Sequence, residues 1–279
     1  MCTAGNSAVL WSFTSAAVAA PGGRLPAPPS GYRWEANRTL SDEFNGTELD
    51  HSKWRDHIPG WQGRKPGKFM PSSVTVKDGH LRIRCSPMKN SEDGYTIACG
   101  AVQAKSRSAL YGCYECRMKA SGLTASTAFW MVSDPIKHPP GELKQELIVQ
   151  LSIGKSKQFG HHMKSNAMSG LKEPGKERLK AEVTQRAKLK SGAADEFHTY
   201  GCWWIDANTM KFYADGQHVY TINPSTKFDA KPFRHPLKIT LTCSTFDWQP
   251  KPTKEELTDP KLNSALFDYV RAYKLVKTD

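Results

Sequence analysis

The sequence predicts an all-β fold, a sandwich or barrel of about ten or more short strands. Two observations lead to this prediction. First, Asp78-Gly79 and Asp215-Gly216 each separate two runs of alternating apolar and polar residues, which is the pattern of a tight hairpin. Second, β-branched and aromatic runs recur between turn residues along most of the chain, whereas apolar residues at helical spacing are rare.

The runs that predict strands follow one another from Gly31 to the end of the chain. They are residues 74–76, 81–84, 101–106, 112–120, 128–132, 147–153, 198–205, 210–213, 217–222, 237–242 and 267–275. The exception is residues 170–192, where Leu179, Val183 and Leu189 have near-helical spacing among charged residues. We expect a charged surface insertion that could include a helix. A nucleic-acid-binding arm is disfavoured there because acidic residues interrupt the basic run.

Three segments of different composition divide the chain. Residues 1–20 carry no charge and end in Ala17-Val18-Ala19-Ala20, which is typical of a signal peptide, although a basic leader is missing. Residues 21–31 are a Pro- and Gly-rich tether, and residues 32–279 contain no repeat or composition break, so we expect one domain there. The apolar run is too short to span a membrane. We therefore expect a secreted or periplasmic protein with no membrane partner.

The chain is basic, and this limits its partners. Lys and Arg number 39 against 27 Asp and Glu, a formal net charge of +12. Nucleic acid, an acidic membrane surface and a sulfated or carboxylated polysaccharide all suit this charge, and so does a surface that is charged only for solubility. No nucleic-acid-binding motif accompanies the charge, so a nucleic-acid binder ranks low among these alternatives.

Six cysteines follow the predicted leader, at positions 85, 99, 113, 116, 202 and 243. In an exported protein an even number allows one to three disulfides, and six cysteines allow 15 connectivities. Cys113 and Cys116 have CxxC spacing without a second pair or a His cluster, so buried thiols or disulfide halves are favoured over a metal site. We predict no metal ligands and no cofactor, and leave a structural calcium ion open.

One carboxylate, Glu146, stands inside the otherwise apolar and β-branched run of residues 144–154. Burying an acid is costly unless it is hydrogen-bonded or functional. The residues alone leave three interpretations of Glu146 open. It is a catalytic group, the remnant of one, or a structural acid paired with Arg or Lys.

Several segments together resemble glycoside hydrolase family 16, over roughly residues 40–275. The matching segments are Asp42-Glu43-Phe44-Asn45-Gly46-Thr47-Glu48-Leu49-Asp50 with Lys53-Trp54, Gly100-Ala101-Val102-Gln103 with Lys105, Phe129-Trp130-Met131, Phe197-His198-Thr199-Tyr200 with Trp203-Trp204, Phe212-Tyr213-Ala214-Asp215-Gly216 and Asp268-Tyr269-Val270-Arg271-Ala272-Tyr273. Trp61-Gln62-Gly63-Arg64 and residues 162–167 resemble the branch that acts on red-algal galactans, the agarases and porphyranases.

The resemblance implies a β-jelly-roll sandwich of two antiparallel sheets with a concave carbohydrate-binding cleft, and retaining hydrolysis by two carboxylates on one strand. Such a mechanism needs a nucleophile and an acid/base about 5–5.5 Å apart. The family motif Glu-x-Asp-x-x-Glu achieves this when a one-residue bulge brings positions i and i+5 to one face. On this sequence the motif assigns Glu146 to the nucleophile, Ile148 to the orienting aspartate position and Leu151 to the acid/base position. Without the bulge, Gln150 takes the acid/base position.

Neither Leu151 nor Gln150 has a proton to donate at neutral pH, and losing general acid/base help typically costs ~10²- to 10⁴-fold in rate. Ile148 also removes the carboxylate expected to orient the nucleophile. Residues close enough in sequence to replace the acid are Glu142, Asp134, His161 and His162.

We therefore expect a protein of this family that recognises an anionic or sulfated galactan and hydrolyses it weakly or not at all. The alternative is an active retaining endo-hydrolase of a β-linked galactan or glucan that uses Glu146 with a non-standard acid. In either case we expect a polysaccharide partner and a monomer.

Binding residues are expected among the flat aromatic and hydrogen-bonding side chains of the matching segments. Trp61, Trp130 and Trp248 are candidate platforms for sugar rings, with core packing as the alternative for each. Arg64 is a candidate donor to a ring oxygen or a sulfate. His162 and Asn166 are candidate donors to hydroxyl groups. Met168 stands where galactan-acting relatives tend to carry His, which weakens the transfer of their subsite chemistry.

Overall fold

The computed structural model describes residues 25–279, and nearly all of its regular structure is β-strand. The strands in these residues are β1 (Tyr32–Ala36), β2 (Trp54–Arg55), β3 (Gly67–Phe69), β4 (Val74–Lys77), β5 (His80–Arg84), β6 (Ser86–Glu92), β7 (Tyr95–Ala104), β8 (Gly112–Lys119), β9 (Ser126–Val132), β10 (Ile136–His138), β11 (Gly141–Ile153), β12 (His162–Lys172), β13 (Leu179–Lys188), β14 (His198–Asp206), β15 (Thr209–Ala214), β16 (Gln217–Ile222), β17 (Lys238–Ser244) and β18 (Ser264–Lys277). The helical turns are η1 (Arg38–Leu40), η2 (Pro71–Ser73) and α1 (Lys254–Thr258). No helix within residues 25–279 is long and apolar enough to cross a membrane.

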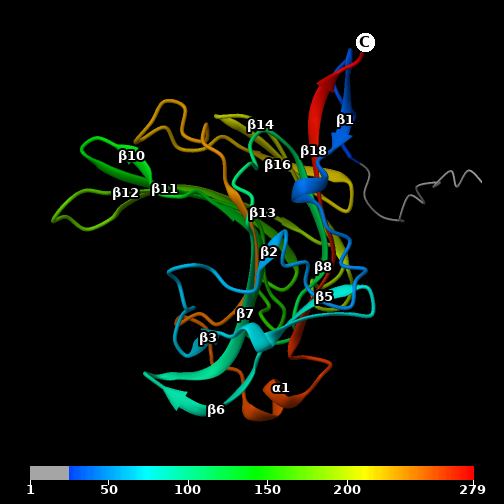
Figure 1. The fold of residues 1–279 in the computed structure, drawn as a ribbon, viewed down its shortest axis with the longest axis vertical. Coiled ribbons are helices and arrows are strands. Elements are labelled where there is room, and N and C mark those ends of the chain that lie inside the picture. Colours follow the sequence, from blue (N-terminus) through cyan, green and yellow to red (C-terminus); the bar gives the residue numbers. More distant parts are fainter. Residues whose placement is uncertain (1–24) are drawn as a thin grey trace, which may run out of the picture.

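The strands form two sheets that pack against each other (Figure 1). One sheet has the order β16-β15-β14-β8-β18-β5-β4, with β1 paired to β18. The other has the order β13-β12-β11-β9-β17-β7-β2, with β10 on β11 and both β3 and β6 on β7. Neighbouring strands are antiparallel except β3 and β7. The predicted sandwich of antiparallel sheets is confirmed.

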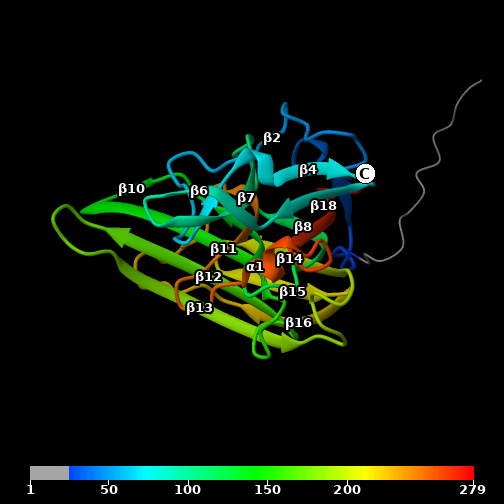
Figure 2. The same ribbon diagram turned by 90° about the horizontal axis from the view of Figure 1, so that it is seen from below.

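The core lies between the two sheets and is supplied by alternate residues of each strand. Leu147 and Val149 of β11 and Phe267 of β18 are fully buried and belong to one hydrophobic cluster. Because successive side chains of a strand point to opposite faces, their neighbours on β11 face away from this core. Figure 2 shows β11, β12 and β13 side by side, with β13 outermost.

The two Asp-Gly hairpin turns are confirmed. Asp78 and Gly79 have φ of 55° and 73°, and Asp215 and Gly216 have φ of 48° and 78°. These are the left-handed angles that a tight two-residue turn needs, and Asp and Gly adopt them at low cost. The turns join β4 to β5 and β15 to β16.

The prediction that residues 170–192 could include a helix is wrong, because this region belongs to the β12–β13 hairpin. The apolar residues of the second strand alternate rather than follow a helical period, with Ala181 buried and Val183 and Ala187 half-buried. Polar side chains, charged at Glu182 and Arg186, occupy the positions between them. This is the period of two that a strand requires.

Of the alternatives left open for the cysteines, the structure has buried thiols: all six cysteines of residues 25–279 are buried and free. The sulfur of Cys85 lies 3.4 Å from that of Cys243 and 3.5 Å from that of Cys99, whereas a disulfide bond is about 2.05 Å long. Cys113 and Cys116 occupy odd and even positions of β8 and so point to opposite faces. Their CxxC spacing therefore neither closes a disulfide nor chelates one ion.

The predicted signal peptide (1–20) and residues 21–24 of the predicted tether lie outside the described residues. The remainder of the tether precedes β1, which begins at Tyr32. The indole nitrogen of Trp34 donates a hydrogen bond to the Pro26 carbonyl oxygen at 2.7 Å.

Candidate active site

The catalytic-motif strand, β11, carries the bulge that the family motif requires. Glu146 pairs with Val132 of β9 and Ile148 with Trp130, but the register then shifts by one residue, so that Leu151 pairs with Ala128. The extra residue brings Glu146, Ile148 and Leu151 to one face of the sheet.

Gln150 consequently points away from this face. It is fully buried, its amide nitrogen donates to Ser152 Oγ at 2.6 Å and to the His162 carbonyl oxygen at 3.1 Å, and its carbonyl oxygen accepts from the Lys164 backbone N–H at 2.8 Å. The unbulged register, with Gln150 at the acid/base position, is therefore excluded.

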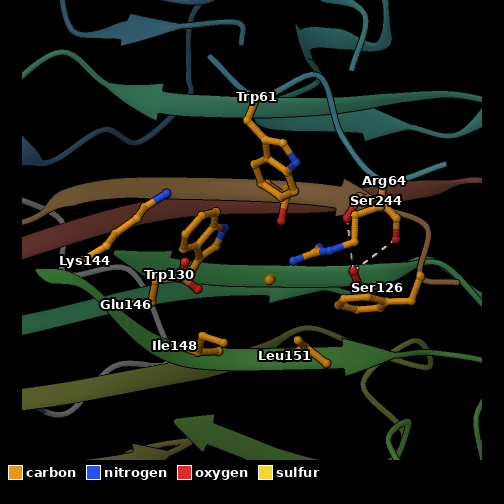
Figure 3. A pocket seen from close by; sticks show the side chains of 12 residues that line it. Trp61, Arg64, Ser126, Trp130, Lys144, Glu146, Ile148, Leu151 and Ser244 are labelled. Carbon is orange, nitrogen blue, oxygen red and sulfur yellow. Dashed lines mark hydrogen bonds between the residues drawn. The ribbon is translucent and has the colours of Figure 1, made fainter. Parts of the chain in front are cut away.

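The outward face of β11, together with β9, β17 and two loops, forms a pocket of about 200 Å³ (Figure 3). Its lining residues are Trp61, Arg64, Ser126, Ala128, Trp130, Lys144, Glu146, Ile148, Leu151, Thr242, Ser244 and Phe246. Glu146 is the one carboxylate among them. Figure 3 shows Glu146 and Leu151 at opposite ends of the β11 segment, with Arg64 reaching in from the far wall. The pocket thus combines a single acid, two cations and several flat aromatic rings.

Arg64 is positioned by two aromatic rings. Its guanidinium carbon lies 4.9 Å from the centre of the Trp61 ring and 4.8 Å from that of Phe246. Partial burial of this guanidinium lowers the pKa of Arg64 from its ordinary value, while the charges of Glu146 and Asp247 act in the opposite direction. Arginine stays charged at any physiological pH, so the pocket holds a fixed cation suited to an anionic group.

The loop that carries Trp61 and Arg64 is fastened to the end of β17 by Thr245. The Thr245 hydroxyl donates to the Arg64 carbonyl oxygen at 2.9 Å and accepts from the Gly67 backbone N–H at 2.9 Å. A Cβ atom on Gly67 would lie 2.5 Å from that hydroxyl oxygen and 2.7 Å from the Cys99 sulfur. Gly63 has φ of +105°, in the left-handed region. The Gly63 and Gly67 positions therefore allow the loop to fold tightly under the pocket.

The predicted tryptophan platforms have different environments. Trp130 is 9% exposed and lies edge-on to Trp61 at 6.1 Å, while Trp61 also packs on Phe69 at 5.0 Å. Both therefore contribute to packing and to the pocket wall. Trp248 does not line the pocket; it is 52% exposed and stacks on Phe246 at 4.9 Å.

His162 and Asn166 also lie outside the pocket lining, although Asn166 pairs directly with Ile148 across β11 and β12. The Asn166 amide nitrogen donates to Glu182 and Thr184 of β13 at 3.1 and 2.9 Å. His162 Nδ1 and Asn166 Oδ1 are buried and have no hydrogen-bond partner among residues 25–279. Met168 is the cross-strand neighbour of Glu146.

None of the four candidate replacement acids lines the pocket. Asp134 is instead held by Lys238 at 2.5 Å and Arg107 at 3.1 Å, and the hydrogen bond from Lys238 is the main reason that its pKa is lowered. A carboxylate with a lowered pKa is a poor proton donor at neutral pH. No group of three or more His, Cys, Asp and Glu side chains in residues 25–279 is arranged to hold a metal ion.

Several lining residues were not predicted from the sequence. Ser126 and Ala128 alternate with Trp130 on β9, and Thr242 and Ser244 alternate on β17. The period of two would have identified the first two from Trp130. Ser126 Oγ donates to the Ser244 carbonyl oxygen at 3.1 Å, which ties these strands together at one end of the pocket (Figure 3). Lys144 precedes Glu146 by two residues on β11, so the same period would have identified it, whereas Phe246 had no comparable signal.

Comparisons with known proteins agree with this geometry. A family model described as the GH16 domain of β-porphyranases A–D matches residues 34–275. β-Porphyranase E of Zobellia galactanivorans is 41% identical over 257 residues, covering 90% of this chain and 91% of that protein. β-Porphyranase B of Phocaeicola plebeius is 38% identical, covering 90% and 88%. The crystal structure of the β-porphyranase BpGH16B from the human gut bacterium Bacteroides plebeius superimposes with a TM-score of 0.87 at 37% identity, covering 91% of this chain and 96% of that one.

Proposed function

Because the chain belongs to glycoside hydrolase family 16, in the group of the β-porphyranase A–D domains, we propose that it recognises an anionic or sulfated red-algal galactan and hydrolyses it weakly or not at all. The observation that carries this proposal is the Leu151 side chain, which lines the pocket at the position where the retaining mechanism needs an acid/base. An alkyl group can neither protonate the leaving oxygen nor deprotonate water. Its presence there is expected to cost ~10²- to 10⁴-fold in rate.

The rest of the pocket supports binding. Sugar rings present apolar C–H faces edged by hydroxyls, and Trp61 and Trp130 offer the aromatic surfaces that suit them. Arg64 and Lys144 offer charge-assisted donors to an anionic substituent. The relatives' names identify porphyran and agarose as the first galactans to test.

The test combines an assay of turnover with an assay of binding. We expect no detectable release of reducing ends from porphyran, agarose, carrageenan or laminarin, together with measurable binding to at least one of them by affinity electrophoresis or calorimetry. If the parent protein releases reducing ends and Glu146→Gln abolishes this release, the proposed loss of hydrolysis is contradicted. Salt-sensitive binding to DNA without binding to any polysaccharide would contradict galactan recognition and favour the nucleic-acid alternative.

A retaining hydrolase with a non-standard acid is the second candidate function, and Asp247, an exposed residue next to the pocket lining, is the carboxylate to test for that role. Asp247 follows Phe246 of the pocket lining, and its charge acts on Arg64 together with that of Glu146. If the parent does release reducing ends, this candidate predicts that Glu146→Gln and Asp247→Asn each abolish turnover while leaving binding intact. Retained turnover in Asp247→Asn would eliminate Asp247 as the acid.

The cellular setting is part of the proposal. The uncharged run that ends at Ala20 supports export from the cytoplasm, where a polymeric galactan would be met. We propose that the exported protein acts as a monomer. Sequencing the N-terminus of the mature protein and measuring its mass in solution test these two points.

A further inference from the structure

A continuous set of aromatic side chains leads out of the pocket. Phe246 lines the pocket and stacks on Trp248 at 4.9 Å and 29°, and Trp248 in turn meets the edge of Phe159 at 5.6 Å. We call Phe246, Trp248 and Phe159 the aromatic ladder. Trp248 is 52% exposed, so the outer part of the ladder presents a flat apolar surface to solvent. An exposed aromatic surface continuous with a pocket is typical of a ligand-binding groove.

The ladder ends at two cations that lie side by side. The Lys164 ammonium sits 5.2 Å over the Phe159 ring, and Lys164 pairs directly with Arg186 across β12 and β13. Both side chains line a shallow hollow together with Gln158, Phe159, Thr184 and Gln185, and no carboxylate contributes to its lining. Neither cation takes part in an ion pair within residues 25–279.

Like charges directly opposite each other on neighbouring strands destabilise a sheet. An anion bound between Lys164 and Arg186 would remove this repulsion. Cations on β13 also protect an edge strand from pairing with another chain. Edge protection explains a cation on β13, but it explains neither its placement opposite a second cation nor the exposed ladder that leads to both.

We propose that the aromatic ladder and the Lys164–Arg186 pair form a second subsite, which binds a sulfate ester on the part of a polysaccharide chain that extends beyond the pocket. The subsite rests on the proposed galactan-binding function. Trp248 receives the apolar face of a sugar ring. Lys164 and Arg186 donate to the sulfate oxygens, with Arg186 supplying a planar guanidinium and Lys164 a mobile point charge.

The test compares porphyran with the same preparation after chemical removal of its sulfate esters, in calorimetry or affinity electrophoresis. Lys164→Gln combined with Arg186→Gln should weaken binding of the sulfated chain roughly tenfold, since hydrogen bonds to charged groups contribute at least that factor. The same variant should bind the desulfated chain as the parent does. Trp248→Ala should weaken binding of both chains because it removes a stacking surface.

The matched control is Lys274→Gln combined with Lys277→Gln, which removes the same charge from exposed positions of β18 in the other sheet. It should bind both chains as the parent does. The subsite is overturned if Lys164→Gln/Arg186→Gln binds sulfated porphyran with parental affinity, or if the control loses as much affinity. In either case, the proposed galactan-binding function still stands if the parent protein binds porphyran and Trp61→Ala abolishes that binding. If the parent binds neither chain, the proposed function fails and the subsite fails with it.

Discussion

Replacing Ile148 with Asp and Leu151 with Glu in one variant should generate or raise hydrolysis of a galactan that the parent binds. Both positions already face the pocket on the bulged strand that carries Glu146. The two new carboxylates would complete the retaining arrangement of nucleophile, orienting acid and acid/base. The expected gain is the general acid/base contribution, ~10²- to 10⁴-fold over the parent.

The substitutions also have a structural cost. Leu151 is 8% exposed and Ile148 is half-buried, so replacing both apolar side chains should lower the free energy of unfolding, by roughly 1.5–3 kcal/mol for Leu151 and by less for Ile148. Glu146 and the aspartate introduced by Ile148→Asp would lie on the same face two residues apart, and like charges at that distance favour a shared proton. We therefore expect a lower melting temperature together with higher activity.

The assay is release of reducing ends, with Ile148→Asn/Leu151→Gln as the matched control. The control has nearly the same shapes and polarity but no titratable group, so it should remain as inactive as the parent. Adding Glu146→Gln to the active variant should abolish its turnover. Equal activity in the amide control, or activity that survives Glu146→Gln, would refute the assignment of these three positions. A folded variant that binds galactan yet stays inactive would refute the inference that the missing carboxylates are what limits hydrolysis.

Two further predictions concern the support of the site and of the fold. Thr245→Val removes the hydroxyl that joins Arg64 to Gly67, so it should lower the melting temperature by roughly 5 °C and weaken galactan binding; Thr245→Ser keeps the hydroxyl and should retain both properties, and an unaffected Thr245→Val would show that the loop needs no such anchor. The His198 ring bonds to Asp215 at 2.8 Å, and although burial acts to lower the pKa of His198, this hydrogen bond and the nearby negative charges raise it overall. When the pKa of a histidine is raised in the folded state, its interaction contributes fully to the free energy of unfolding below the unfolded pKa of about 6.5. That contribution is lost as the pH rises through the folded pKa. The melting temperature of the parent minus that of His198→Gln should therefore shrink as the pH increases above about 6.5; a difference that does not change with pH would exclude the linkage.

The sequence predicted those parts of the site that depend on local periodicity. The alternation of strand residues and the spacing of the family motif put Glu146, Ile148 and Leu151 on one face, and the bulge in β11 bears this out. The same alternation was misinterpreted at residues 179–189, where three selected apolar positions suggested a helix although the full apolar set alternates. Charged residues between small apolar ones leave the two periods hard to separate over such a short stretch.

What the sequence could not show is which distant segments meet. Thr245 and Gly67 are 178 positions apart, and only the folded sheets bring the end of β17 under the loop after Trp61. Phe246 could not be predicted as a pocket residue for the same reason, because the Arg64 side chain that packs on its ring comes from that loop. The choice of Trp248 as a sugar platform stays a prediction, and its contact with Phe159 is one that no local pattern in the sequence indicates.

The replacements on β11 change the charge of the pocket as well as its chemistry. With the family motif in place and its acid/base protonated, two carboxylates would offset Arg64 and Lys144, and the lining residues would carry no net charge. In this chain Glu146 alone faces the same two cations, so the net charge is positive. A positive pocket attracts an anionic chain, and the half-buried Glu146 carboxylate shares the pocket lining with the two cations. The proposed loss of the acid/base residue would therefore favour binding of a sulfated ligand, and under that proposal Glu146 need not act as a nucleophile.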